Sequence, residues 1–186
     1  DNLAFDWRDR LYVSNYHDGS IKRLRRNGKL RTVSRGGLTA PGGVAIKDIN
    51  GRKTLFVSDT YTLRRYDART GRLLQTHYSS VGDYSGLVTP LTVAPHGDNL
   101  AVTSWFGQTV QVWDPVSDVI VAMHEVPNLP LNAIGYQGDT VVAELVGGCV
   151  TRFRTHGKDA EQLACGFYVP AGLAQRNGDL WVSDWA

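Results

Sequence analysis

The stretch that decides the fold is "LYVSNYHDGSIKRL" at residues 11–24, because close copies of this phrase return along the chain. "LFVSDTYTLRRYD" occupies residues 55–67, and "LWVSDWA" occupies residues 180–186. Each copy opens with a short apolar run and then reaches a polar residue. Such runs, bounded by Gly, Asn and Asp, predict short β-strands separated by turns. Their recurrence predicts a repeated β-module.

Two sets of positions define the repeat. The first set, called the marker residues here, is the polar residue that ends each apolar run: Asn15, Asp59, Ser104, Glu144 and Asp184. The second set is the proline that opens phrases such as "PGGVA": Pro41, Pro90, Pro130 and Pro170, at spacings of 49, 40 and 40 residues. Together they divide the chain into units at 1–40, 41–89, 90–129, 130–169 and 170–186.

Each complete unit contains four short strands, and the third unit displays them best. We expect its strands at residues 91–94, 99–104, 109–114 and 119–126. In the first unit Asn27-Gly28 joins strands three and four, which is a strong hairpin signal. Four antiparallel strands in roughly 40–45 residues form the blade of a β-propeller. We therefore expect an all-β propeller with four complete blades and half of a fifth, in one partial domain from a six-bladed ring.

The composition is that of an ordinary soluble, globular chain. Hydrophobic residues make up 42%, charged residues make up 20%, and the formal net charge is +2, so nucleic acid is not an expected partner. No apolar run approaches the roughly 18 residues that span a bilayer. The stretch at 21–35 has seven basic residues and no acid. It could attract a polyanion, but we favour a solvated face that protects a strand edge from pairing.

The phrases resemble the NHL, SMP-30/gluconolactonase and virginiamycin B lyase-like group of propellers. The resemblance is carried by "P-x-G-[VL]-A … G-x-L-[YFW]-V-S-[DN]", present in "PGGVAIKDINGRKTLFVSD" and "PAGLAQRNGDLWVSD". The SMP-30 resemblance implies a lactone or ester hydrolase with a divalent cation, such as Ca²⁺, at the mouth of a central channel. The residues after the four prolines are Gly42, Leu91, Leu131 and Ala171, whose side chains cannot bind a cation, so the ligands would come from the marker residues.

Strand direction places a candidate site. The connection entering strand one and the one leaving strand two open at the same end of a blade, so the prolines and marker residues share that end. Glu144, Asp59 and Asp184, with Asn15, could hold a hard cation through oxygen atoms or supply acid and base groups. The alternative is that these side chains cap the following turn, which we favour for Asp59 and Asp184. Thr92, Asn132 and Ser104 could line the same channel mouth or bond locally.

Aromatic side chains directly follow three of the marker residues. Tyr16, Trp105 and Trp185 could stack on a flat ligand, or could pack between blades with one polar end in water. We expect packing. The five histidines, at 17, 77, 96, 124 and 156, show no spacing typical of a metal site.

The two cysteines fall on the last two strands of the fourth unit. If Arg154 faces Ala160 across a hairpin, outward counting places Cys149 opposite Cys165. Directly opposed residues are close enough for a disulfide after small adjustment. A bridge would indicate an oxidising compartment, periplasmic or secreted. Two buried free thiols are the alternative.

Two functions remain open. The first is an SMP-30-like propeller that binds a small molecule or hydrolyses it with a cation. The second is an NHL-like scaffold that binds a protein or another macromolecule. Carboxylates aimed at one point would favour the cation, whereas carboxylates bonded to backbone amides would favour the scaffold.

Overall fold

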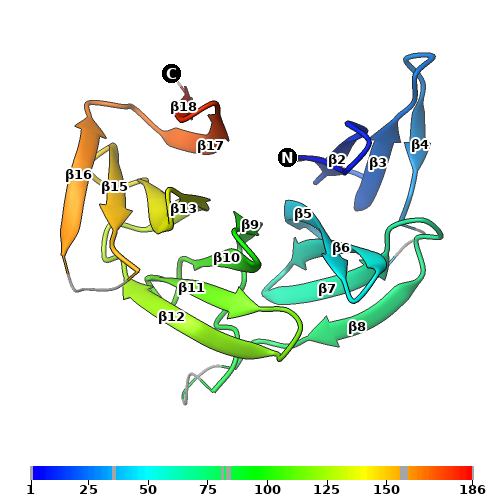
Figure 1. Cartoon of the computed structure of the whole chain (residues 1–186), viewed down its shortest axis with the longest axis horizontal. Helices are drawn as coiled ribbons and strands as arrows, with labels where there is room; N and C mark the ends of the chain where they lie inside the picture. The colour runs from blue at the N-terminus through cyan, green and yellow to red at the C-terminus, as the bar shows by residue number, and fades with distance from the viewer. Residues whose placement is uncertain (1, 35–36, 81, 83–84, 156–158, 186) are drawn as a thin grey trace. The chain divides into compact units, whose positions relative to one another are not determined.

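The protein is described here from a computed structural model, which defines residues 2–34, 37–80, 82, 85–155 and 159–185. Within those residues it contains eighteen β-strands and no helix, and therefore no helix that could cross a membrane. The chain divides into two compact halves, Asp1–Val93 and Ala94–Ala186. From here on, "unit" means one of these halves, and each sequence repeat is called a blade. Figure 1 labels the strands of both units.

The first unit contains two four-stranded antiparallel sheets with consecutive strand order. The first sheet comprises β1 (Leu3–Phe5), β2 (Leu11–Asn15), β3 (Ser20–Leu24) and β4 (Leu30–Thr32). The second comprises β5 (Pro41–Ile49), β6 (Arg52–Asp59), β7 (Thr62–Asp67) and β8 (Leu73–His77). The β5–β6 hairpin is long, and its turn uses Asn50 (φ 51°) and Gly51 (φ 78°), the left-handed pair that matches strand twist.

The second unit contains two further four-stranded sheets and one two-stranded sheet. They comprise β9 (Thr92–His96), which starts at the end of the first unit, β10 (Asn99–Ser104), β11 (Thr109–Asp114) and β12 (Val119–Glu125); β13 (Pro130–Tyr136), β14 (Asp139–Glu144), β15 (Cys149–Phe153) and β16 (Ala160–Cys165); and β17 (Pro170–Arg176) with β18 (Asp179–Asp184). Four complete blades and half of a fifth, as the sequence predicts, are confirmed.

The first unit is held together where its two blades meet. Tyr12, Ile21, Leu55 and Val57 are fully buried in one apolar cluster, which also includes Tyr66. In both blades of this unit, the serine before the marker residue links its strand to the proline-phrase segment of the next blade. Ser14 donates to the carbonyl of Gly42 over 2.7 Å, and Ser58 donates to the carbonyl of Leu91 over 2.6 Å. These links fix the proline-phrase segment that lies beside each marker residue.

The second unit repeats this organisation with different residues. Ile134, Val141 and Val150 form a buried cluster, against which Leu173 and Val182 pack. Polar bonds add to the contact between the last two blades. The Tyr136 hydroxyl donates to the carbonyl of Gly178 over 2.6 Å, and the Gln175 amide donates to the carbonyl of Gly135 over 3.1 Å.

The cysteine pairing is confirmed, although the predicted register is wrong near the turn. Cys149 lies opposite Cys165, and the two are joined by a disulfide. However, Ala160 faces Phe153, not Arg154. A β-bulge between Val150 and Thr151 adds one residue to β16 and restores the expected alignment at the cysteines. Part of the hairpin loop, including His156, lies outside the described residues.

Candidate functional site

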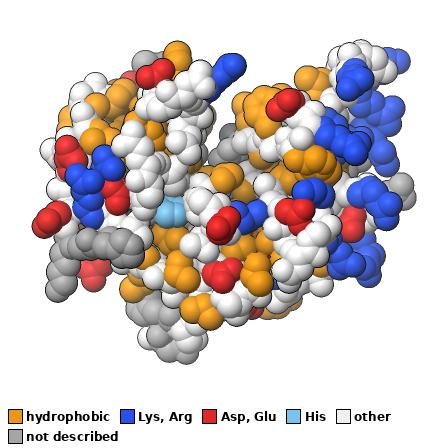
Figure 2. Space-filling model, viewed as in Figure 1, with side chains coloured by type: hydrophobic (Ala, Val, Ile, Leu, Met, Phe, Trp, Pro, Cys, Tyr) orange, Lys and Arg blue, Asp and Glu red, His pale blue; other side chains and the backbone are white. Residues whose placement is uncertain are grey.

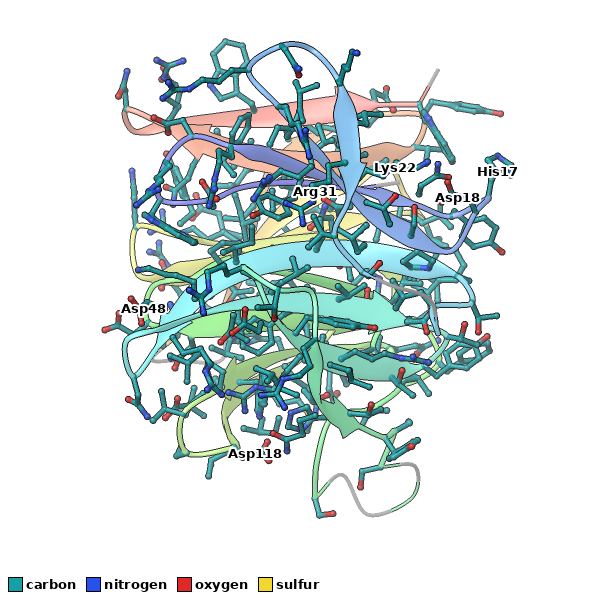
Figure 3. The ribbon with its side chains drawn as sticks, turned by 90° about the vertical axis from the view of Figure 1, so that its right-hand side faces the viewer. His17, Asp18, Lys22, Arg31, Asp48 and Asp118 are labelled. Atoms are coloured by element: carbon teal, nitrogen blue, oxygen red, sulfur yellow. A yellow bond between two sulfur atoms is a disulfide. The ribbon has the colours of Figure 1, made fainter. Side chains whose placement is uncertain are left out.

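Each marker residue ends the second strand of its blade. In three blades the strand register pairs the marker residue directly with the proline of the same blade: Pro41 with Asp59, Pro130 with Glu144, and Pro170 with Asp184. In the first unit, Figure 3 shows His17 and Asp18, which follow Asn15, at one end of the strands and Asp48 at the opposite end. In these three blades the proline phrase and the marker residue therefore share one end of the blade.

Asp59 is a buried backbone cap. Its residue is 1% exposed, and Oδ1 accepts the N–H groups of Thr39 at 2.8 Å and Ala40 at 2.7 Å. Oδ2 lies 2.9 Å from a guanidinium nitrogen of Arg64. The carboxylate is thus used to hold the entry to β5 and to neutralise Arg64, as the capping interpretation requires.

Asp184 makes the same kind of cap in the last blade. Its oxygens accept the N–H of Tyr168 at 3.0 Å and that of Val169 at 2.7 Å. These bonds to backbone amides, that of Tyr168 foremost, hold the pKa of Asp184 below its ordinary value. The favoured interpretation of the two "VSD" carboxylates, capping of the adjacent backbone, agrees with both environments.

Asn15 and Ser104 bond within their own turns. The Asn15 Oδ1 atom accepts the N–H of His17 at 3.1 Å, and the Ser104 hydroxyl accepts the N–H of Gly107 at 2.9 Å. Both bonds are of the Asx or Ser/Thr turn type, which fixes the chain as it leaves a strand. In these two blades the marker residue therefore shapes the loop that follows it.

Glu144 differs from the other marker residues. It is 3% exposed, and within the described part of the chain its carboxylate makes no hydrogen bond or ion pair. The backbone amides after it pair instead with carbonyls, Leu145 with Leu129 at 3.0 Å and Val146 with Asn128 at 2.9 Å. The Glu144 carboxylate is therefore not used as a cap, unlike those of Asp59 and Asp184.

Asn132 and Thr92 occupy strand-start positions. The Asn132 amide donates weakly to the carbonyl of Ala171 at 3.4 Å, while its Oδ1 atom is buried and has no partner in the described chain. Thr92 is half-buried on β9, beside Gly43. Among the described residues, no three His, Cys, Asp or Glu side chains lie close enough together to hold a metal ion.

The loops after the marker residues, called the post-marker loops here, expose large apolar side chains. In the first unit Tyr16 is 58% exposed and Tyr61 is 46% exposed. In the second unit the exposed members are Phe106 (72%), Val146 (52%) and Trp185 (75%). The expectation that Tyr16 packs between blades is therefore wrong, and the same expectation for Trp185, in the half blade, stays a prediction. Trp105 is half-buried.

One post-marker loop is also strained. Thr60 and Tyr61 form the two-residue connection between β6 and β7, and both have positive φ angles, 44° and 65°. A bulky residue in this conformation is uncommon and must be held by its surroundings. Thr62 helps, because its hydroxyl donates to the carbonyl of Asp59 over 2.6 Å. The Tyr61 side chain in this turn is 46% exposed.

The sequence reasoning missed the serine that precedes the marker residue. Ser14 and Ser58 are fully buried and bridge strands far apart in sequence, as described above. The signal was present, because Ser recurs at this place in "VSN" and in both "VSD" phrases. A polar residue on the buried face of a strand needs a partner, and here the partner is the next proline-phrase segment.

A scan of the sequence against protein-family models finds no match, and a search of curated proteins finds none either. Solved structures do match. Virginiamycin B lyase from Staphylococcus aureus aligns with a TM-score of 0.73 and 15% identity, over 98% of this chain and 62% of that one. This chain thus spans less than two thirds of the length of that lyase.

Two other solved structures align as well. A chain of a nidogen–laminin complex aligns with a TM-score of 0.74 and 22% identity, over 99% of this chain and 71% of that one. A protein of unknown function from Bacteroides caccae aligns with a TM-score of 0.71 and 13% identity, over 99% and 70%. At these identities the likeness establishes the β-propeller fold. Membership of the NHL or SMP-30/gluconolactonase families stays a prediction.

Proposed function

We propose that this chain is a non-catalytic propeller scaffold whose post-marker loops bind a protein partner. The observation that carries the proposal is the use of Asp59 as a backbone cap beside a loop that exposes Tyr61. Caps order the loops, while exposed aromatic side chains supply the apolar anchors that dominate protein interfaces.

The comparison with the nidogen–laminin complex supports this proposal as an analogy, because a chain of similar fold there is found in complex with a protein. The Cys149–Cys165 disulfide supports an oxidising compartment, periplasmic or extracellular, as the place where the partner is met.

Site-specific photo-crosslinking tests the scaffold proposal. A benzophenone amino acid replaces Phe106, which lies in a post-marker loop, or replaces Val121, which is 53% exposed on β12. We expect the Phe106 probe to capture one defined protein from the organism's extracytoplasmic fraction and the Val121 probe to capture none. Equal capture by both probes, or capture by neither, would contradict the proposal.

A second candidate function rests on Glu144. This residue is 3% exposed and makes no ion pair in the described chain, and the buried, unpaired Oδ1 atom of Asn132 belongs to the same blade. Oxygen ligands of this kind suit a divalent cation such as Ca²⁺, which could polarise the carbonyl of a lactone or ester. A small-molecule site of the SMP-30 type would therefore include Glu144.

A thermal-shift titration with CaCl₂ separates the two candidates. A hydrolase of this type would show a rise in Tm that Glu144→Gln removes, together with lactone hydrolysis by the wild-type chain. The scaffold proposal expects no rise in Tm below millimolar Ca²⁺ and no hydrolysis. Asp184→Asn is the matched control, because it removes a marker carboxylate that is engaged in capping.

A further inference from the structure

Charge is distributed very unevenly along the chain. Residues 1–93 contain 16 Lys and Arg against 8 Asp and Glu, a net charge of +8. Residues 94–186 contain 4 against 10, a net charge of −6, and the two values give the overall +2. The small total therefore conceals a strongly basic first unit. Figure 2 shows Lys and Arg side chains gathered over the part of this unit that carries β3 and β4.

The β3–β4 hairpin places like charges opposite each other. Arg23 pairs in register with Arg31. Nearer the turn, Arg25 lies opposite Lys29, and the N–H of Arg25 donates to the carbonyl of Lys29 over 2.9 Å. Because side chains alternate along a strand, these four residues share one side of the hairpin, called the basic face here. Directly opposed like charges have β-carbons about 5 Å apart and destabilise a sheet.

A third arginine, from the neighbouring blade, lies beside Arg23 and Arg31. Arg69, in the β7–β8 turn, lines a shallow pocket together with Arg23, Arg31 and Thr70, over a floor that includes the buried Val33 and Ala68. The turn is set close to the end of β4. A β-carbon on Gly71 would lie 1.8 Å from the carbonyl oxygen of Val33, so only glycine permits this approach.

The basic face has no carboxylate of its own. Four other basic residues of the unit form ion pairs with carboxylates: Lys22 with Asp18, Arg10 with Asp6, Lys53 with Asp48 and Arg64 with Asp59. In the described residues no acid forms an ion pair with Arg23, Arg25, Lys29, Arg31 or Arg69. Asp67 accepts the N–H groups of Arg69 and Thr70, and its carboxylate also attracts the Arg69 charge without forming an ion pair with it.

We propose that the basic face and the adjoining three-arginine pocket bind a sulfated polysaccharide. Guanidinium groups form bidentate hydrogen bonds with tetrahedral oxyanions, so Arg23, Arg31 and Arg69 together suit one sulfate group bound over the pocket. The row formed by Arg23, Arg25, Lys29 and Arg31 suits the next charges of an extended chain. The anion would also relieve the repulsion between the opposed pairs, which gives the arrangement a physical reason.

Two observations favour a polysaccharide over nucleic acid. Residues 20–32 contain no aromatic side chain on which a base could stack. In addition, the Cys149–Cys165 disulfide belongs in an oxidising compartment, where surface and matrix polysaccharides are the abundant polyanions. The inference does not depend on the scaffold function proposed above, because it uses neither the post-marker loops nor Glu144.

The test measures binding of fluorescein-labelled heparin oligosaccharide to the 186-residue chain by anisotropy across a NaCl series. The variant is Arg23→Gln/Arg31→Gln. The matched control is Lys22→Gln/Arg176→Gln. It also loses two positive charges, but from residues outside the basic face. We expect the variant to bind at least about tenfold more weakly, with a salt slope lower by on the order of one per lost contact. The control should bind like the wild type.

Thermal unfolding accompanies the binding assay, because Arg23→Gln/Arg31→Gln removes a repulsive pair and should leave Tm unchanged or higher. Loss of binding by a folded variant supports the site. Equal weakening of variant and control would overturn it in favour of diffuse net charge, and so would absence of heparin binding at 50 mM NaCl. Equal or tighter binding of single-stranded RNA, or of vesicles containing anionic lipid, would overturn the polysaccharide assignment.

Discussion

At the scale of single residues, Asp59 and Asp184 are both the aspartate of a "VSD" phrase, and each accepts two backbone N–H groups. Their surroundings differ. Asp59 is buried and lies against Arg64, whereas Asp184 is exposed and has no such cation in the described chain. The free energy that a cap contributes depends on how much water it replaces, so the two should respond differently to the same substitution.

Asp59→Asn should lower the free energy of unfolding by about 2–4 kcal/mol, because it leaves the Arg64 guanidinium without its buried counter-charge. Asp184→Asn should cost less, since an amide oxygen can still accept one N–H and the site faces water. Urea denaturation of both variants measures the difference. Equal losses would show that the ion pair with Arg64 contributes nothing beyond the cap.

Gly43→Ala should be strongly destabilising, by roughly 3 kcal/mol or more, because the new β-carbon would lie 2.2 Å from the backbone nitrogen of Val93. The matched control is Gly51→Ala in the β5–β6 turn. Gly51 has open space around it and a φ of 78°, so only backbone strain of about 1–2 kcal/mol is expected there. Thermal denaturation compares them, and a milder effect at Gly43 would mean that the two strands can separate.

The capping role of Asp59 could be anticipated from sequence because it is local chemistry at a strand end. The bond from Ser58 to Leu91 could not, because its partner is 33 residues away and depends on how the strands pack. Glu144 lies between these cases. Its position was predicted, but its burial without a partner follows from packing around β13 and β14.

At the scale of elements, β9, β12 and β14 meet at a polar cluster inside the second unit. The Thr140 hydroxyl lies 3.0 Å from Nε2 of His96 and 3.2 Å from Nε2 of His124. Burial of His124, and secondly the proximity of His96, lower the pKa of His124, while Asp139 acts in the opposite direction. The Phe153 ring packs 5.4 Å from the His124 ring.

This cluster predicts a pH-dependent stability. Because the pKa of His124 is lower in the folded state, the unfolded chain binds more protons. Stability is then complete above the unfolded pKa of about 6.5 and declines as pH falls through the folded value. We expect urea midpoints to fall between pH 7 and pH 5, and His124→Gln to flatten that decline. His17→Gln, at an exposed histidine, is the control, and an unchanged slope in His124→Gln would refute the assignment.

The strands of the third blade were predicted nearly residue by residue, because alternation and turn residues are strong there: expected strands at 99–104 and 109–114 match β10 and β11. The β15–β16 hairpin was harder. The predicted strand pairing near its turn is wrong by one residue. A β-bulge, which leaves no clear trace in the sequence, shifts the pairing by one residue and restores the predicted alignment at the cysteines.

At the scale of the whole molecule, a repeat predicts a fold efficiently because every copy imposes the same strand pattern. It says little about what differs between copies. Net charge is one such difference, since the basic first unit and the acidic second unit share the same phrases. The pairing of like charges on β3–β4 appears only once the register is known.

The β3–β4 hairpin of the first unit and the β15–β16 hairpin of the second unit should therefore respond to salt with opposite signs. On β3–β4 the pair Arg23 and Arg31 repel, whereas on β15–β16 Arg152 faces Glu161 in register and Arg154 lies 3.4 Å from that carboxylate. Raising NaCl shortens the range of both interactions, from a Debye length of about 30 Å at 0.01 M to about 8 Å at 0.15 M.

Hydrogen exchange read by mass spectrometry resolves the two hairpins in one experiment. Between 0.01 M and 0.3 M NaCl, amides of β3–β4 should exchange more slowly, by about twofold, because a few tenths of a kcal/mol of repulsion per pair is screened. Amides of β15–β16 should exchange at the same rate or faster, since screening weakens an attraction. In Arg23→Gln/Arg31→Gln the slowing on β3–β4 should largely disappear. A change of the same sign and size in both hairpins would mean that salt acts on general stability and that the opposed arginines are not under electrostatic strain.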